Sequence, residues 1–160
     1  MSGRGVLFAI GDDVLERLGN AANDAEALAI VNEVEERWEN ACELDKAWDA
    51  IHRALTDGRL SAQGGGSTLG QVILGGTLLV STESAIVSVK TADRVEAIAH
   101  ALRGWDRARF RAAYHRIDRN EYGELDEEDF TYSLAWFERL APFYERAARS
   151  ESAVLFSADL

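Results

Sequence analysis

The chain has 160 residues, of which 47% are apolar and 28% charged, a composition typical of a folded globular protein rather than a disordered chain. Its formal net charge of −11 repels phosphate backbones, which argues against nucleic-acid binding, whereas the same charge would speed the encounter with a basic protein partner. No segment approaches the roughly 20 apolar residues of a membrane span. The apolar run at the N-terminus is too short for a signal peptide, so we expect a cytoplasmic protein with no membrane contact.

The first third of the chain predicts one strand and three helices. Gly5 to Ile10 is apolar on both faces, as expected of a strand that is covered on both sides. A short helix follows, capped by Asp12 or Asp13 and ended by Gly19. Asp24 opens a longer helix, whose apolar residues recur every three to four positions at Leu28, Val31, Val34, Trp38 and Cys42. A third helix begins near Asp45, with Leu44, Trp48, Ile51 and Leu55 on one face.

The middle of the chain predicts a loop, a strand and two helices. Residues 59–70 include Gly64 to Gly66 and form the loosest segment, and residues 69–74 fit either a helical turn or a strand. Ile86 to Val89 is typical of a strand. Thr91 then caps one helix, and Asp106 begins another.

The last helix is the most regular one predicted. Its apolar residues step by four and three over five turns, at Phe130, Leu134, Phe137, Ala141, Tyr144 and Ala148. Pro142 lies inside this pattern and would remove a hydrogen bond to the Glu138 carbonyl, which predicts a bend near residues 138–142. Ala153 to Ser157 predicts a closing strand. Together these elements predict one α+β domain spanning residues 1–160, with about six helices packed on a small sheet of three or four short strands.

Two segments of the chain are distinctive: the stretch from Leu44 to Thr56 (LDKAWDAIHRALT) and the C-terminal run from Phe137 to Ser157 (FERLAPFYERAARSESAVLFS). Both resemble the YfbM-like family of bacterial domains. The chain departs from the family at Tyr122-Gly123, where relatives tend to have Tyr-Pro, and at Pro142. The family is a domain of unknown function, so the resemblance implies a compact α+β fold but no reaction, cofactor or catalytic residue.

The helix around Trp48 carries the first candidate site. Asp45, Asp49 and His52 are spaced i, i+4 and i+7, which places them on one side of that helix. A carboxylate beside an imidazole can tune it for proton transfer. In the alternative interpretation, which we favour, Asp45 caps the helix and His52 hydrogen-bonds a backbone carbonyl at the edge of the core.

A local excess of arginine between Arg103 and Arg119 forms the second candidate site. Arg107, Arg111 and His115 line one side of a helix and could hold a phosphate or a carboxylate. The alternative is that acidic residues at 33–43 or 121–129 pair with these arginines within the molecule. We favour this intramolecular pairing.

The remaining motifs are weaker. The segment Asp118 to Asp129 partly matches a calcium loop, but Tyr122 occupies the fifth position, and Asp129 is too short for the twelfth. The glycines of residues 64–70 lack the Lys-Ser/Thr of a phosphate loop, which favours a flexible loop. Cys42 is the only cysteine and is expected in the core on a helical face. We therefore expect no metal and no cofactor.

Two functions fit these observations. The favoured one is a non-enzymatic protein-binding module, of immunity or regulatory type, whose acidic surface covers a basic partner. The alternative is a binder of a small anionic ligand, or an enzyme, with a pocket near His52 and the Arg107 helix. The candidate ligand- or partner-binding residues are Asp45, Trp48, Asp49, His52, Arg107, Arg111 and Tyr122. The sequence does not indicate an oligomeric state.

Overall fold

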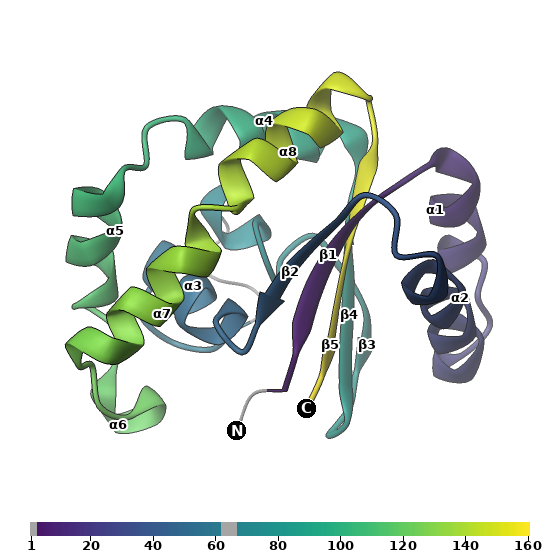
Figure 1. The fold of residues 1–160 in the computed structure, drawn as a ribbon. Helices are drawn as coiled ribbons and strands as arrows, with labels where there is room; N and C mark the ends of the chain where they lie inside the picture. The colour runs from purple at the N-terminus through teal and green to yellow at the C-terminus, as the bar shows by residue number, and fades with distance from the viewer. Residues whose placement is uncertain (1–2, 62–66) are drawn as a thin grey trace.

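The computed structural model describes residues 3–61 and 67–160, which form a five-stranded sheet between two helical layers (Figure 1). The strands run in the order β2-β1-β5-β4-β3, and each neighbouring pair is antiparallel. Their bounds are β1 (Gly5–Ile10), β2 (Ala41–Asp45), β3 (Thr77–Ser81), β4 (Ala85–Lys90) and β5 (Ala153–Asp159). Because β1 and β5 are neighbours, the first and last strands lie side by side in the middle of the sheet.

The helices divide unequally between the two faces of the sheet (Figure 1). One face is covered by α1 (Asp12–Gly19) and α2 (Asp24–Arg37). The other face carries α3 (Trp48–Leu55), the short 3-10 helix η2 (Leu69–Gln71), α4 (Ala92–Leu102), α5 (Arg107–Tyr114), α6 (Arg119–Tyr122), α7 (Glu127–Phe137) and α8 (Leu140–Arg149). Along the described residues, no helix combines the length and apolar character needed to cross a bilayer.

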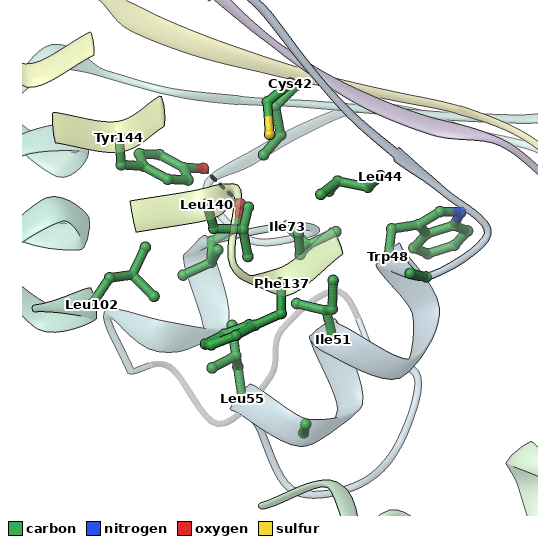
Figure 2. Close-up of a cluster of buried hydrophobic side chains, with 14 of the residues drawn as sticks. Cys42, Leu44, Trp48, Ile51, Leu55, Ile73, Leu102, Phe137, Leu140 and Tyr144 are labelled. Carbon is green, nitrogen blue, oxygen red and sulfur yellow. Dashed lines mark hydrogen bonds between the residues drawn. The ribbon is translucent and has the colours of Figure 1, made fainter. Parts of the chain in front are cut away.

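Two hydrophobic cores follow from the alternation of side chains along the central strands. Leu7 and Phe156 point into the larger core, under α3 to α8, whereas Phe8 and Leu155 point into the smaller core, under α1 and α2. This is the period-two pattern of a strand that is buried on both faces. Figure 2 shows the larger core, in which the hydroxyl of Tyr144 donates a hydrogen bond of 2.6 Å to the carbonyl of Val72.

Several predicted elements are confirmed. The strands predicted at 5–10, 86–89 and 153–157 lie in β1, β4 and β5. The short helix ends at Gly19 as predicted, and helices follow Thr91 and Asp106. The side chain of Asp106 accepts a hydrogen bond of 2.8 Å from the backbone N–H of Arg109, so this residue is a true N-cap. The α+β class is confirmed, but the sheet has five strands instead of three or four, and the described residues form more than six helices.

The predicted long helix from Asp24 to Cys42 is confirmed as far as Arg37 and wrong beyond it. Trp38 adopts a left-handed conformation with φ of 49° and ends α2, which is a common way for a helix to stop. Cys42 and Leu44 then belong to β2, where buried residues alternate with half-buried ones. Cys42 is a core residue as expected, but it lies on a strand. The third helix accordingly begins at Trp48 and includes neither Leu44 nor Asp45.

The last predicted helix is two helices, α7 and α8, separated at Glu138 and Arg139. The bend near residues 138–142 is confirmed, but its predicted cause is wrong. Pro142 is the third residue of α8. Backbone N–H groups in the first turn of a helix have no acceptor within that helix. Pro142 therefore removes no helical hydrogen bond and instead favours the start of α8.

Candidate functional site

A cleft of about 760 Å³ opens where the start of α3 faces the α6–α7 segment. We call it the acidic cleft. It is lined by Lys46, Trp48, Asp49, Arg53, Leu60, Glu83, Ile86, Glu121, Tyr122, Glu124, Asp126, Asp129 and Leu160. Carboxylates outnumber the two cations, Lys46 and Arg53, in this lining. The cleft is therefore a concave region of negative charge.

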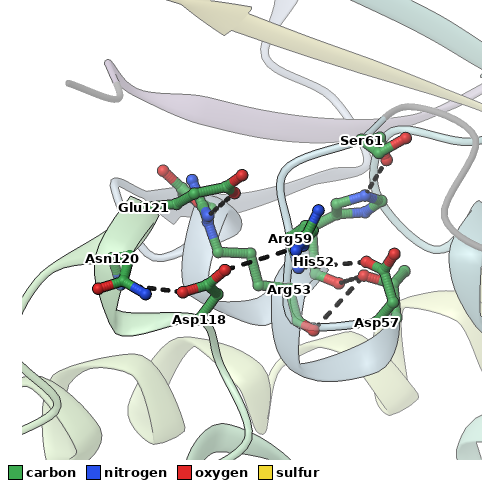
Figure 3. Close-up of polar contacts among 10 residues, drawn as sticks. His52, Arg53, Asp57, Arg59, Ser61, Asp118, Asn120 and Glu121 are labelled. Atoms are coloured by element: carbon green, nitrogen blue, oxygen red, sulfur yellow. Dashed lines mark hydrogen bonds and ion pairs between the residues drawn. The ribbon is translucent and has the colours of Figure 1, made fainter.

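Arg53 holds the wall of the cleft together. Its Nε donates a hydrogen bond of 2.5 Å to Asp49 Oδ1, and its Nη1 donates one of 2.9 Å to Glu121 Oε2. Its guanidinium carbon also lies 5.6 Å from the centre of the Tyr122 ring. Only 6% of Arg53 is exposed, and Figure 3 shows its side chain extending from α3 to Glu121 on α6. Two carboxylates and an aromatic ring thus enclose one guanidinium and fix α6 against α3.

Asp129 organises the other side of the cleft. Its Oδ2 accepts hydrogen bonds from the hydroxyls of Tyr114 and Tyr122, at 2.5 and 2.8 Å. Burial, together with the bond to the Asp129 carboxylate, raises the pKa of both tyrosines above the ordinary value, so both hydroxyls remain donors at neutral pH. The backbone N–H of Asp129 donates to Asp126 Oδ1 at 2.8 Å, which caps α7.

The rim of the cleft combines charge with exposed apolar surface. Glu83, Glu124 and Asp126 are exposed to solvent. Leu60 and Leu160 line the same cleft and are 40% and 43% exposed, which is unusual for large apolar side chains in this molecule. Such a combination of acidic and apolar groups can hold a cationic side chain together with its aliphatic neighbours.

Three of the predicted binding residues, Trp48, Asp49 and Tyr122, line the acidic cleft. Trp48 is fully buried, and its Nε1 donates to the Gly3 carbonyl at 2.9 Å. Asp45 lies beside the cleft, where its Oδ2 accepts a hydrogen bond of 2.6 Å from the Tyr132 hydroxyl on α7. The prediction that Asp45 shares a helix face with Asp49 is wrong, because Asp45 ends β2 with a φ of 47° and does not cap α3.

His52 is completely buried. Its Nε2 lies 2.5 Å from the carbonyl oxygen of Ser61 and donates to it (Figure 3). This contact matches the alternative in which His52 hydrogen-bonds a backbone carbonyl. Burial lowers the pKa of His52, so the ring is neutral at physiological pH.

Arg107 and Arg111 lie apart from the acidic cleft. Arg111 forms two hydrogen bonds with Glu127, of 2.9 and 3.0 Å, and its guanidinium carbon lies 4.0 Å from the centre of the Phe130 ring. This is an intramolecular pair with the 121–129 segment, as one of the two interpretations held. Arg107 lines a different cleft, of about 340 Å³, with Trp105 and Phe137.

The other motifs have structural roles where they are described. Asp118 caps α6 by accepting a hydrogen bond of 2.9 Å from the Asn120 N–H, so the segment that resembles a calcium loop is a helix start. Gly64 to Gly66 lie outside the described residues. Within the described ranges, no group of three or more His, Cys, Asp and Glu side chains is arranged to hold a metal ion.

Arg53 and Glu121 are the residues that sequence reasoning missed. Arg53 follows Asp49 by four positions, and this spacing was the available signal for their ion pair. Glu121, Glu83 and Leu160 offered no local signal, because only the folded chain brings them together.

The fold and the cleft define an α+β domain, with an antiparallel sheet between helical layers and a concave acidic cleft where α3 faces the α6–α7 segment. Residues 1–157 match the family "Domain of unknown function (DUF1877)", and the chain belongs to this family. Its fold is similar to that of a solved protein of unknown function, YfbM from Escherichia coli. The two are 20% identical, with a TM-score of 0.73 over 97% of this chain and 99% of that one. Among curated proteins, no sequence matches the chain.

Proposed function

We propose that this protein is a non-enzymatic binding module, of immunity or regulatory type, which binds a basic partner protein through the acidic cleft. The observation that carries the proposal is the lining of that cleft, which combines exposed carboxylates with two exposed leucines. The formal charge of −11 over the whole chain would add long-range attraction for a cationic surface.

The contacts of Arg53 illustrate the chemistry that the cleft can offer a partner. A guanidinium already sits there between two carboxylates and beside a tyrosine ring. An arginine or lysine of the partner would find the same kinds of group at Glu83, Glu124 and Asp126. Apolar residues next to that cation would pack on Leu60 and Leu160. A basic segment with interspersed apolar residues is therefore the expected occupant.

The alternative, an anionic ligand held near His52 and the Arg107 helix, has less support. Arg111 is already paired with Glu127, and the buried His52 donates to the Ser61 carbonyl. Arg107 lines a separate cleft. No observation therefore favours an anion between these groups.

The test compares two double variants that change the net charge equally. Glu83→Lys with Glu124→Lys reverses two exposed charges in the cleft, whereas Glu36→Lys with Glu39→Lys reverses two exposed charges near the end of α2. In affinity purification from the native host at low salt, wild type and the α2 variant should recover the same stoichiometric basic protein. The cleft variant should recover little or none.

Binding kinetics provide the second readout. The association rate of the recovered partner with wild type should fall as salt rises, because screening weakens attraction between opposite charges. Recovery of no basic partner at low salt would contradict the proposal. Equal binding by both double variants would show that the partner does not use the acidic cleft.

A further inference from the structure

Lys90 is the most unusual ionisable residue outside the acidic cleft. It is the last residue of β4, and only 1% of it is exposed. Its Nζ donates hydrogen bonds to the carbonyl of Ile73 and, at 2.8 Å, to the hydroxyl of Ser88. It also lies 5.6 Å from the centre of the Phe156 ring. None of the ion pairs found along residues 3–61 and 67–160 involves Lys90.

These surroundings disfavour a charged amine. Burial without a carboxylate lowers the pKa of Lys90 well below the ordinary value, since the ammonium ion loses its hydration and gains no counter-charge. The neutral amine keeps a lone pair on Nζ. Desolvated lysines of this kind are nucleophiles toward carbonyl compounds.

A cleft of about 440 Å³ adjoins this lysine. We call it the Lys90 cleft. Its lining residues are Ser67, Gly70, Gln71, Gly75, Gly76, Thr77, Val89, Lys90, Thr91 and Arg94. Glycine is needed in its wall: a Cβ at Gly75 would lie 2.4 Å from the Gly70 carbonyl oxygen, and one at Gly76 would lie 3.3 Å from Lys90 Cγ. Bare backbone therefore lines the cleft beside the lysine stem.

Two polar groups of the cleft can contact a ligand. Arg94 is exposed on the first turn of α4 and can bind a carboxylate with two parallel hydrogen bonds. The Oε1 atom of Gln71 is buried and, among the described residues, has no hydrogen-bond partner. A ligand with a hydrogen-bond donor would satisfy it.

We propose that the Lys90 cleft binds small carbonyl compounds, 2-oxo acids in particular, and that Lys90 Nζ forms an imine with them while Arg94 binds the carboxylate. The lone pair of Nζ attacks the carbonyl carbon, so that a C–N bond forms and the C=O π bond breaks. The carbonyl oxygen then leaves as water with the two amine protons, which gives C=N. No oxidant or reductant is required. This site is independent of the proposed protein-binding function.

The chain offers a built-in control, because it contains only two lysines, the exposed Lys46 and the buried Lys90. The native protein would be treated at pH 7 with glyoxylate and sodium cyanoborohydride, which reduces an imine to a stable amine. Peptide mass spectrometry would then quantify the label on each lysine and on the terminal amine. We expect Lys90 to be labelled several-fold faster than Lys46, since an ammonium ion must first lose a proton to react.

Arg94→Gln tests the recognition of the carboxylate. It should slow labelling of Lys90 by glyoxylate about tenfold, a typical effect of losing a charge-assisted contact, and leave labelling by the neutral probe formaldehyde unchanged. Lys90→Met should abolish the label at that position and leave Lys46 as in wild type.

Two results would overturn the proposal. The first is labelling of Lys46 while Lys90 does not react even with formaldehyde until the chain is denatured. This result would show that Lys90 is inaccessible in the folded protein and has only a structural role. The second is an equal effect of Arg94→Gln on both probes. This result would show that Arg94 does not recognise the carboxylate, so the cleft would not be specific for 2-oxo acids. Both measurements use chains that retain Lys90, so neither depends on whether Lys90→Met folds.

Discussion

Gly5 is a residue whose identity is dictated by two aromatic neighbours, Trp48 and Phe156. A Cβ at this position of β1 would lie 2.5 Å from Trp48 Cδ1 and 3.0 Å from Phe156 Cε1. Trp48 cannot move easily, because it is fully buried and its Nε1 is hydrogen-bonded to Gly3. Gly5→Ala should therefore lower the free energy of unfolding by roughly 1–3 kcal/mol, as overpacked cores do.

Urea denaturation measures this loss, and Gly19→Ala is the matched control. Apart from the backbone of α1 and the two chain neighbours, no atom of the described residues lies within 4 Å of the Cβ that would be added at Gly19, the last residue of α1. Alanine should be neutral there or stabilise the protein by up to about 1 kcal/mol. Equal effects of the two substitutions would show that Trp48 yields to the new methyl group.

His52 should make the stability of the protein depend on pH in mild acid. Burial lowers its folded-state pKa below the ordinary value, so the unfolded state binds the proton first as pH falls below about 6.5. The stability present above that pH is then lost as pH falls toward the folded-state pKa. His52→Gln should flatten this slope in urea titrations between about pH 5 and 7.

The exposed His100, at the end of α4, provides the control. His100→Gln should leave the slope close to that of wild type. A wild-type slope that survives His52→Gln would assign the dependence on pH to other groups. The readout is the slope rather than the absolute stability, so a general destabilisation by His52→Gln does not obscure it.

At the scale of elements, the break between α7 and α8 does not depend on Pro142 alone. Pro142 lies in the first turn of α8, where no helical hydrogen bond is lost. Pro142→Ala should therefore change the free energy of unfolding by less than about 1 kcal/mol and leave the break at Glu138 in place. Ala148→Pro, in the last turn of the same helix, lies beyond the first turn, where an N–H has a helical acceptor, and should cost about 3 kcal/mol.

Urea denaturation of the two variants tests this difference in position. A large loss in Pro142→Ala would mean that the ring of Pro142 itself creates the break. A small loss in Ala148→Pro would mean that the last turn of α8 contributes little to stability.

At the scale of the whole molecule, the order of strands predicts where the fold is most resistant to opening. β5 is hydrogen-bonded on both sides, by β1 and β4, whereas β2 and β3 are the sheet edges. Amide hydrogen exchange should therefore be slowest in β5 and its two neighbours, and at least roughly tenfold faster in β3. Peptide-resolved mass spectrometry gives these rates. Equal exchange rates for the amides of β3 and β5 would contradict the prediction that the central strands open less readily than the edge strands.

The sequence could predict those parts of the fold that have a local cause. Alternating or continuous apolar residues marked β1, β4 and β5, and the capping side chain of Asp106 marked the start of α5. Apolar residues at helical spacing identified most of the helix-forming segments. These signals depend on neighbours a few positions away, which the sequence displays directly.

The sequence could not predict features that have non-local causes. Cys42 continues the helical spacing of α2, so the sequence predicted a helix at this position. The strand β2 is defined by its pairing with β1, which lies more than 30 residues away in the sequence. Arg53 was identifiable only as a partner of Asp49, because Glu121 lies 68 residues away. The burial of Lys90 likewise depends on Ile73 and Phe156, which come from other elements.

The sequence alone determined the α+β class, the negative charge and the resemblance to a family of unknown function. Only the tertiary structure decided which carboxylates share a cleft, which arginines are already paired and which lysine is buried. The physical reason is that composition depends only on residue types, and periodicity depends only on residues a few positions apart. Desolvation and charge pairing, in contrast, depend on distances that are set when remote segments pack together.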